Sequence, residues 1–143
     1  GLARQLGPGA RLVIGVDLRK SPDILVPAYD DAQGVTAAFN LNLLARLQNE
    51  LDAAVDIDGF AHRAVWNARD SRIEMHLVAK HPQSIVVAGH EFHFAAGETI
   101  HTENSCKYGR EDFDDLARSA GWRPLDLYAD ADNLFTVRVL EAL

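Results

Sequence analysis

Cysteine is nearly absent from this chain, since Cys106 is the single one among 143 residues. A lone cysteine cannot form a disulfide within the chain, which predicts a reducing compartment such as the cytoplasm. A basic excess is also missing, because 14 lysines and arginines stand against 21 aspartates and glutamates, for a net charge of -7. This balance argues against a nucleic-acid partner and leaves no polybasic patch for anionic membranes.

Long apolar runs are absent as well. No stretch approaches the roughly 18 residues that a membrane helix needs, and the first residues lack the layout of a signal peptide. The dinucleotide fingerprint, the phosphate-binding P-loop and the serine nucleophile elbow are also missing. We therefore expect a cytoplasmic protein with no membrane partner, of a length that fits one domain.

The two ends of the chain predict parts of one α/β sheet. Residues 11–18 form a continuous apolar run, which is typical of a strand buried on both faces of a parallel sheet. Residues 110–120 have the apolar spacing of a helix, and Gly121 suits its end. Residues 124–129 and 134–143 flank a turn and predict an antiparallel hairpin.

The middle of the chain has a different, α+β pattern. Residues 35–51 repeat apolar side chains every four positions, which predicts an amphipathic helix. Residues 56–72 read as a loop or a short helix, residues 72–80 alternate as a strand, and residues 84–105 predict a hairpin after it. The middle, from about residue 19 to residue 107, therefore reads as an insertion between the two ends. The apolar stripe of its helix consists of Val35, Phe39, Leu43, Leu47 and Leu51.

Polar side chains alternate along residues 99–105. Glu103 and Ser105 share one face of the predicted strand, where they offer a charged acceptor and a hydroxyl. Such a pair suits a ligand with two ring nitrogens, such as an imidazole. From spacing alone, a solvated strand end or a cross-strand pair is the favoured interpretation.

The histidines do not have the spacing of a metal motif. His90 and His93 are three residues apart on a predicted strand, so their rings point to opposite faces. His76, His81 and His101 are scattered, and we interpret them as core or surface residues. The sequence therefore predicts no metal site.

Residues 12–51, 72–80 and 97–108 carry a resemblance to a known family. They resemble the C-terminal part of the histidine-specific methyltransferases of ergothioneine biosynthesis, which use S-adenosylmethionine. The resemblance implies an α/β fold, namely the C-terminal part of a class I (Rossmann-like) methyltransferase with an inserted α+β substrate-binding domain.

The domain boundaries follow from this resemblance. It implies Rossmann-like segments at residues 1–18 and 108–143 and a substrate-binding domain at residues 19–107. The family's S-adenosylmethionine site lies upstream, so we expect no cofactor-binding residue in this chain, which is then a fragment or a natural truncation. A truncated sheet exposes apolar surface, which predicts self-association.

The resemblance also implies a role for five residues. Glu103 and Ser105 correspond to the pair that holds the substrate imidazole, and Tyr29 to the tyrosine that contacts the amino-acid backbone group. Thr36 and Met75 correspond to residues that line the pocket.

The implied reaction is methylation of the α-amino group of histidine by direct displacement, which needs neither a metal nor a covalent nucleophile. One alternative is an amino-acid-binding module or pseudoenzyme without methyl transfer. A metal-dependent hydrolase that uses the histidines is a third and less favoured alternative.

Overall fold

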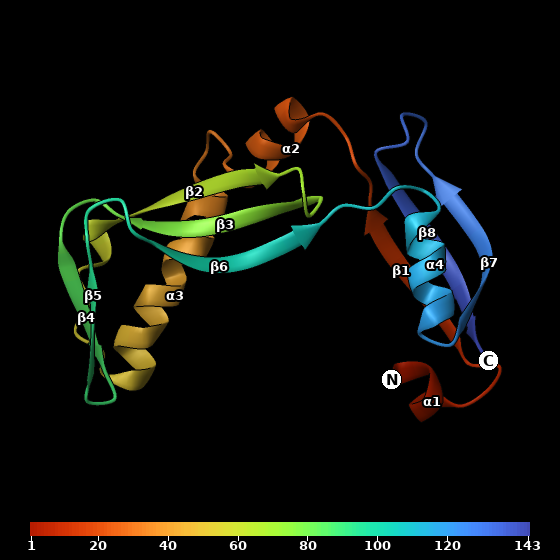
Figure 1. Ribbon diagram of the computed structural model, residues 1–143, viewed down its shortest axis with the longest axis horizontal. Helices are drawn as coiled ribbons and strands as arrows, with labels where there is room; N and C mark the ends of the chain where they lie inside the picture. Colours follow the sequence, from red (N-terminus) through yellow and green to blue (C-terminus); the bar gives the residue numbers. More distant parts are fainter. The chain divides into compact units, whose positions relative to one another are not determined.

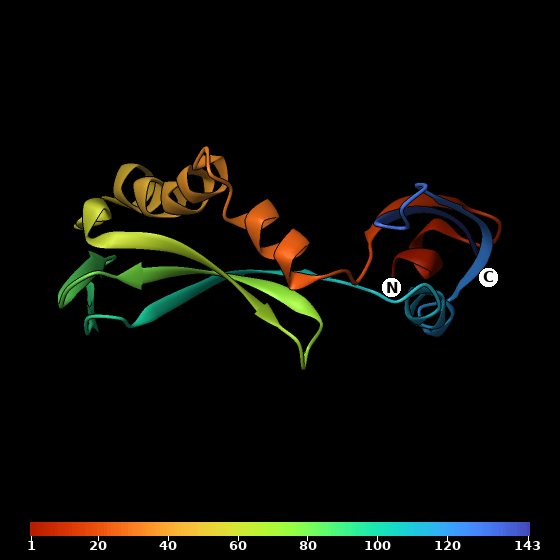
Figure 2. The ribbon, with the colours of Figure 1, turned by 90° about the horizontal axis from the view of Figure 1, so that it is seen from above.

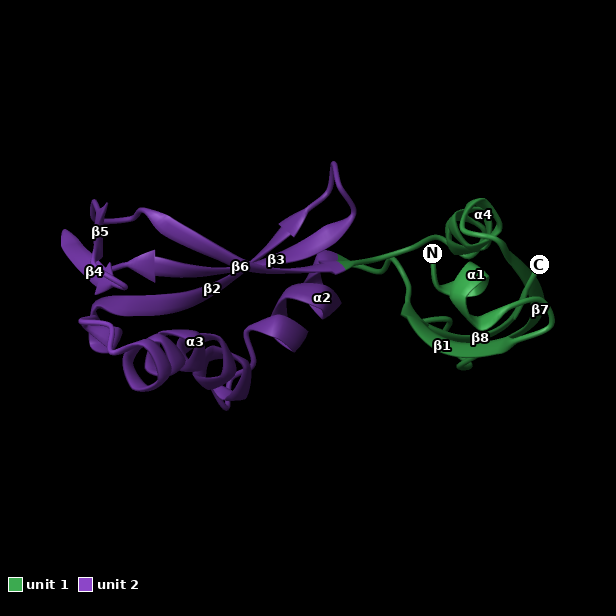
Figure 3. Cartoon of the chain, turned by 90° about the horizontal axis from the view of Figure 1, so that it is seen from below, with its two compact units in different colours: residues 1–21, 106–143 green, residues 22–105 purple.

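The computed structural model describes residues 1–143, which form two compact units (Figure 3). Unit 1 comprises residues 1–21 and 106–143, and unit 2 comprises residues 22–105. Both combine helices with strands, which confirms a mixed α/β protein (Figure 1). No helix has both the length and the apolar character needed to cross a membrane. The Rossmann-like and substrate-binding roles of the segments stay predictions.

Unit 1 contains one antiparallel sheet with the strand order β1-β8-β7. Its strands are β1 (Arg11–Asp17), β7 (Trp122–Ala129) and β8 (Phe135–Ala142). The hairpin predicted near the C-terminus is therefore confirmed. Helices α1 (Leu2–Leu6) and α4 (Asp112–Ser119) lie on one side of this sheet (Figure 2). The core between them contains Ala3, Ala117, Trp122, Leu140 and Ala142.

The strand predicted at residues 11–18 is confirmed as β1, and only one of its two apolar faces is covered in this chain. Leu12 and Ile14 pack against the core, but Val13 points to the other face and is 66% exposed. The whole strand pairs antiparallel with β8, from Arg11 opposite Glu141 to Asp17 opposite Phe135. An apolar run identifies a strand, but only its neighbours decide how many of its faces are covered.

A charged cluster lies at the C-terminal end of β1, around Asp17. The fully buried Lys107 ammonium lies 2.7 Å from one carboxylate oxygen of Asp17, and Lys20 lies 2.6 Å from the other. Burial by itself raises the pKa of Asp17, but the hydrogen bonds and charges of the two lysines outweigh it and lower the pKa below its usual value. The carboxylate therefore stays ionised despite its partial burial.

Unit 2 consists of a sheet covered on one face by two helices (Figure 2). The strand order is β2-β3-β6, and helices α2 (Pro22–Tyr29) and α3 (Val35–Leu51) provide the cover. The strands are β2 (Phe60–Asn67), β3 (Arg72–Ala79) and β6 (Thr99–Cys106). A second hairpin of β4 (Gln83–Val87) and β5 (His90–Phe94) follows β3, and a 3-10 turn, η1 (Ile57–Gly59), precedes β2.

Three sequence predictions for unit 2 need correction. The hairpin expected over residues 84–105 is confined to β4 and β5, and β6 joins the sheet of β2 and β3 instead. Residues 60–67 were expected in a loop or short helix, but they form β2, which pairs along its whole length with β3. Helix α3 was predicted correctly, but most of its predicted apolar stripe is exposed, with Phe39 at 64%, and within the stripe only Leu47 packs against the core. Leu44 and the polar Asn40 are buried instead.

Candidate functional site

Tyr29 and Ser105 meet at the junction of α2 and β6. Their hydroxyl oxygens lie 2.7 Å apart in a hydrogen bond. Tyr29 also packs against the apolar cluster that contains Met75, whose side chain is 4% exposed. The structure therefore brings three of the five predicted site residues together, with Met75 as a core side chain beneath the tyrosine.

A buried polar network binds the backbone carbonyl group of Tyr29. The Nδ2 group of Asn40 donates to the Nδ1 atom of His62 at 3.0 Å and to the carbonyl oxygen of His76 at 3.2 Å. Because Nδ1 of His62 accepts, the ring proton is on Nε2, which donates to the carbonyl oxygen of Tyr29 at 2.7 Å. Helix α3 and strand β2 thus fix the C-terminal end of α2.

Thr36 lies at the start of α3, where Asp31 caps the helix. The backbone N–H groups of Thr36 and Val35 donate to the two carboxylate oxygens of Asp31, at 2.8 and 3.0 Å. Hydrogen bonds from the backbone and side chain of Thr36, followed by that from Val35, lower the pKa of Asp31 to about 2. The carboxylate is therefore anionic at the positive end of the helix dipole.

Glu103 is exposed on β6, two residues before Ser105. Its backbone carbonyl oxygen lies 3.2 Å from Nε2 of His101. Exposure leaves its carboxylate accessible to a ligand. That Glu103 and Thr36 share a pocket with Tyr29 stays a prediction.

The sheet face opposite the helices carries a second polar cluster, formed by Glu74, His76 and His101. One potential ligand atom from each lies within 4.8 Å of the others. The His76 and His101 rings stack with centroids 4.6 Å apart. This grouping of histidines was missed in the sequence because it depends on the pairing of β3 with β6.

Two effects set the charge of this cluster. Hydrogen bonds from Asn67 and then Arg72 dominate the lowering of the Glu74 pKa to about 2. Burial lowers the pKa of His76, although Glu74 opposes that shift. The cluster therefore combines an anionic carboxylate with an imidazole that favours its neutral form.

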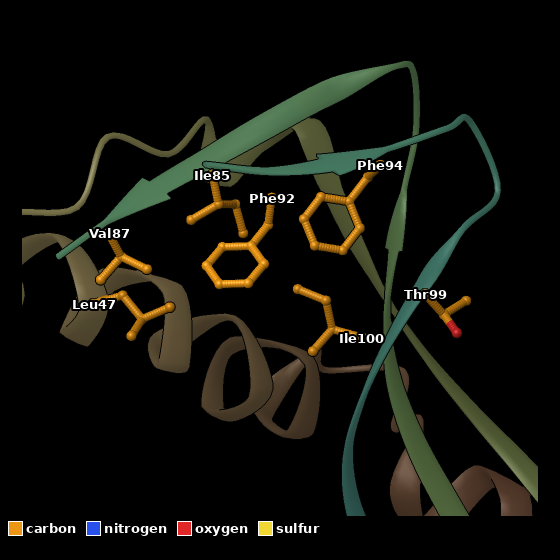
Figure 4. A pocket seen from close by; sticks show the side chains of 7 residues that line it. All are labelled: Leu47, Ile85, Val87, Phe92, Phe94, Thr99 and Ile100. Carbon is orange, nitrogen blue, oxygen red and sulfur yellow. The ribbon is translucent and has the colours of Figure 1, made fainter. Parts of the chain in front are cut away.

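An apolar cavity lies elsewhere in unit 2, between α3 and the β4–β5 hairpin (Figure 4). Its volume is about 340 Å³, and Phe92, Phe94 and Ile100 point into it. Apart from the hydroxyl of Thr99, the side chains that line the cavity are apolar, and none is charged. None of the five predicted site residues lines this cavity.

The expectation that the S-adenosylmethionine site lies outside this chain stays a prediction. Such a site needs a strand followed by a glycine-rich turn and a helix on the same sheet. In unit 1, β1 leads to α2 of the other unit, and β7 turns directly into β8. Asp17 at the end of β1 is already paired with Lys20 and Lys107.

The chain was compared with known protein families and curated proteins. The family model described as histidine-specific, SAM-dependent methyltransferase matches residues 1–142. The chain belongs to this family. It is 47% identical over 131 residues to the histidine N-alpha-methyltransferase of Mycolicibacterium smegmatis, a match that covers 90% of this chain but 41% of that protein.

Two further relatives agree with this assignment. The histidine N-alpha-methyltransferase of Mycobacterium tuberculosis is 47% identical over 109 residues, covering 75% of this chain and 34% of that protein. Ergothioneine biosynthesis protein 1 of Neurospora crassa is 28% identical over 137 residues, covering 85% and 14% of the two chains. The chain therefore spans less than half the length of each of these relatives.

Proposed function

We propose that this chain is the histidine-recognition part of an enzyme that methylates the α-amino group of histidine with S-adenosylmethionine. The observation that carries the proposal is the family match over residues 1–142, together with 47% identity to proteins named histidine N-alpha-methyltransferase. The methyl donor would be bound outside this chain. The β1-β8-β7 sheet of unit 1 would then be the closing part of a Rossmann-like domain.

The geometry of unit 2 supports a role in recognition. Ser105 is already oriented by Tyr29, and Tyr29 is held by His62. In the proposed complex, Glu103 and Ser105 pair with the two imidazole nitrogens of histidine, and the Tyr29 hydroxyl contacts its backbone group. A polar pair built for two ring nitrogens discriminates against amino acids that leave it unpaired.

The experiment is a methylation assay on the full-length product of the gene that encodes this chain. Histidine and S-adenosylmethionine are supplied, and the product is analysed by mass spectrometry for stepwise gain of methyl groups on the α-amine. We expect methylated histidine, and much less product from other amino acids at equal concentration.

A second function, amino-acid binding without methyl transfer, is suggested by the hydrogen-bonded pair of Tyr29 and Ser105, whose proposed role in histidine recognition does not itself require the cofactor. Titration calorimetry with histidine and with S-adenosylmethionine separates the two. If the protein binds histidine but neither binds the cofactor nor forms product, it is a binding module and not an enzyme. If it neither binds histidine or the cofactor nor forms product, both proposed functions are wrong.

A further inference from the structure

Two strands of unit 2 bring a glutamate and two histidines together on the uncovered sheet face. Glu74 and His76 are two positions apart on β3, and His101 lies on the adjacent strand β6. Their ligand atoms lie within 4.8 Å of one another, and the two imidazole rings stack with an interplanar angle of 26°. These three side chains are not used by the function proposed above.

Neighbouring residues orient the carboxylate. The Oε1 atom of Glu74 accepts hydrogen bonds from Asn67 Nδ2 and from Arg72 Nε, both at 2.8 Å. The Oε2 atom lies 3.4 Å from Nε2 of His76. One oxygen of Glu74 is thus held by the protein, while the other points to the histidines.

A hydrogen bond also orients His101. Its Nε2 atom lies 2.8 Å from the amide oxygen of Asn104, which only accepts, so Nε2 carries a proton. In the neutral ring, Nδ1 therefore holds the free lone pair. An imidazole whose second nitrogen is held by a protein acceptor is the usual arrangement of a histidine ligand.

We propose that Glu74, His76 and His101 form a binding site for a divalent transition-metal ion, with Zn²⁺ as the best match. Two imidazoles and one carboxylate are a common Zn²⁺ ligand set, which leaves a fourth position for water. Metal–ligand bonds of about 2.0–2.2 Å in a tetrahedron separate the ligand atoms by about 3.3–3.5 Å. The Glu74–His76 separation of 3.4 Å already fits this edge.

Closing the site takes a small shift of the exposed His101 side chain toward Glu74 and His76, with its Nε2–H group still on Asn104. The bound ion then links β3 to β6 only two residues before Glu103. It would order the segment of β6 that carries Glu103 and Ser105, and this role is independent of methyl transfer.

The test is a titration of the untagged chain with Zn²⁺ in a buffer without chelators, followed by calorimetry. We expect one saturable ion per chain, and a Kd that rises about ten-fold or more in His101→Ala and in Glu74→Gln. The matched control is His93→Ala, because Glu91 and His93 repeat the same Glu-x-His spacing on β5 with their side chains 3.8 Å apart. This control keeps the wild-type Kd.

A second readout follows the geometry of the site. Co²⁺ bound by the wild-type chain should give the intense visible absorption of a four-coordinate ion, and His101→Ala should lose it. Thermal unfolding should shift upward with Zn²⁺ in the wild type but not in His101→Ala. Absence of stoichiometric binding, or equal loss of affinity in His101→Ala and His93→Ala, would overturn the proposal.

Discussion

The Tyr29 hydroxyl lies 2.7 Å from the Ser105 hydroxyl, although 76 positions separate the two residues. This hydrogen bond joins the end of α2 to the end of β6 within unit 2. The two residues were assigned to a common site by family resemblance alone, and the structure now shows that they are in contact.

The first prediction concerns this hydrogen bond. Tyr29→Phe and Ser105→Ala should each weaken histidine binding to the full-length gene product, and the double variant should lose less than the sum. The expected coupling is about 1 kcal/mol, since a neutral hydrogen bond contributes about 0.5–1.5 kcal/mol. Calorimetric titration of the wild type, the two single variants and the double variant with histidine measures this coupling energy. Strictly additive losses would show that the two hydroxyls act on the ligand independently.

The second prediction concerns the network behind Tyr29. Asn40→Leu leaves Nδ1 of His62 and the carbonyl oxygen of His76 without their donor, in a buried position. We expect a loss of about 2 kcal/mol in the free energy of unfolding, within the range for an unsatisfied buried group. Asn42→Leu, on the exposed side of the same helix, is the control and should change little. Denaturant titration that gives equal losses for both variants would contradict the network's role.

The third prediction concerns Glu103. Glu103→Ala should weaken histidine binding by roughly 1.5–3 kcal/mol, the range for hydrogen bonds to charged groups. Glu91→Ala removes the same charge from another exposed strand and serves as the control. S-adenosylmethionine binding should change much less in both. Equal histidine affinity of Glu103→Ala and wild type would make Glu103 a solvated strand-end charge.

The fourth prediction concerns the buried pair of Lys107 and Asp17. Lys107→Met removes the 2.7 Å contact and should destabilise the protein by about 2 kcal/mol. Because the pKa of Asp17 is lower in the folded than in the unfolded protein, its ionised carboxylate stabilises the fold at any pH above its unfolded-state pKa. This stabilisation is lost as the pH falls through the pKa that Asp17 has in the folded protein. The wild type and Lys107→Met should therefore converge in unfolding free energy in acid. A difference that persists unchanged at the lowest pH would point to packing rather than charge.

The fifth prediction concerns the uncovered face of the unit 1 sheet. Val13 is 66% exposed on β1, with Tyr128 at 61% and Phe135 at 44% on the other two strands. Exposed apolar patches of this kind promote association. We expect the 143-residue chain to self-associate in sedimentation velocity at high concentration, and Val13→Asp to reduce this. Val35→Asp, equally exposed on α3, is the control. A wild-type chain that stays monomeric at high concentration would contradict the predicted self-association.

The sequence by itself determined the features that depend on local order. The helices at α3 and α4 follow from apolar spacing along a few turns, and the C-terminal hairpin follows from a turn between two short strands. The family also follows from contiguous stretches, because a family motif is a local property of the chain. These features need no knowledge of which distant segments meet.

Only the tertiary structure decided which residues meet across the chain. Strand β2 read as a loop, because its pairing with β3 and not its composition makes it a strand. Asn40 and His62 gave no signal as positioning residues, since their role depends on α3 lying across β2. The same holds for the stacking of His76 on His101. Long-range contacts are selected by the total burial and hydrogen bonding of the folded unit, and spacing along a single segment does not record them.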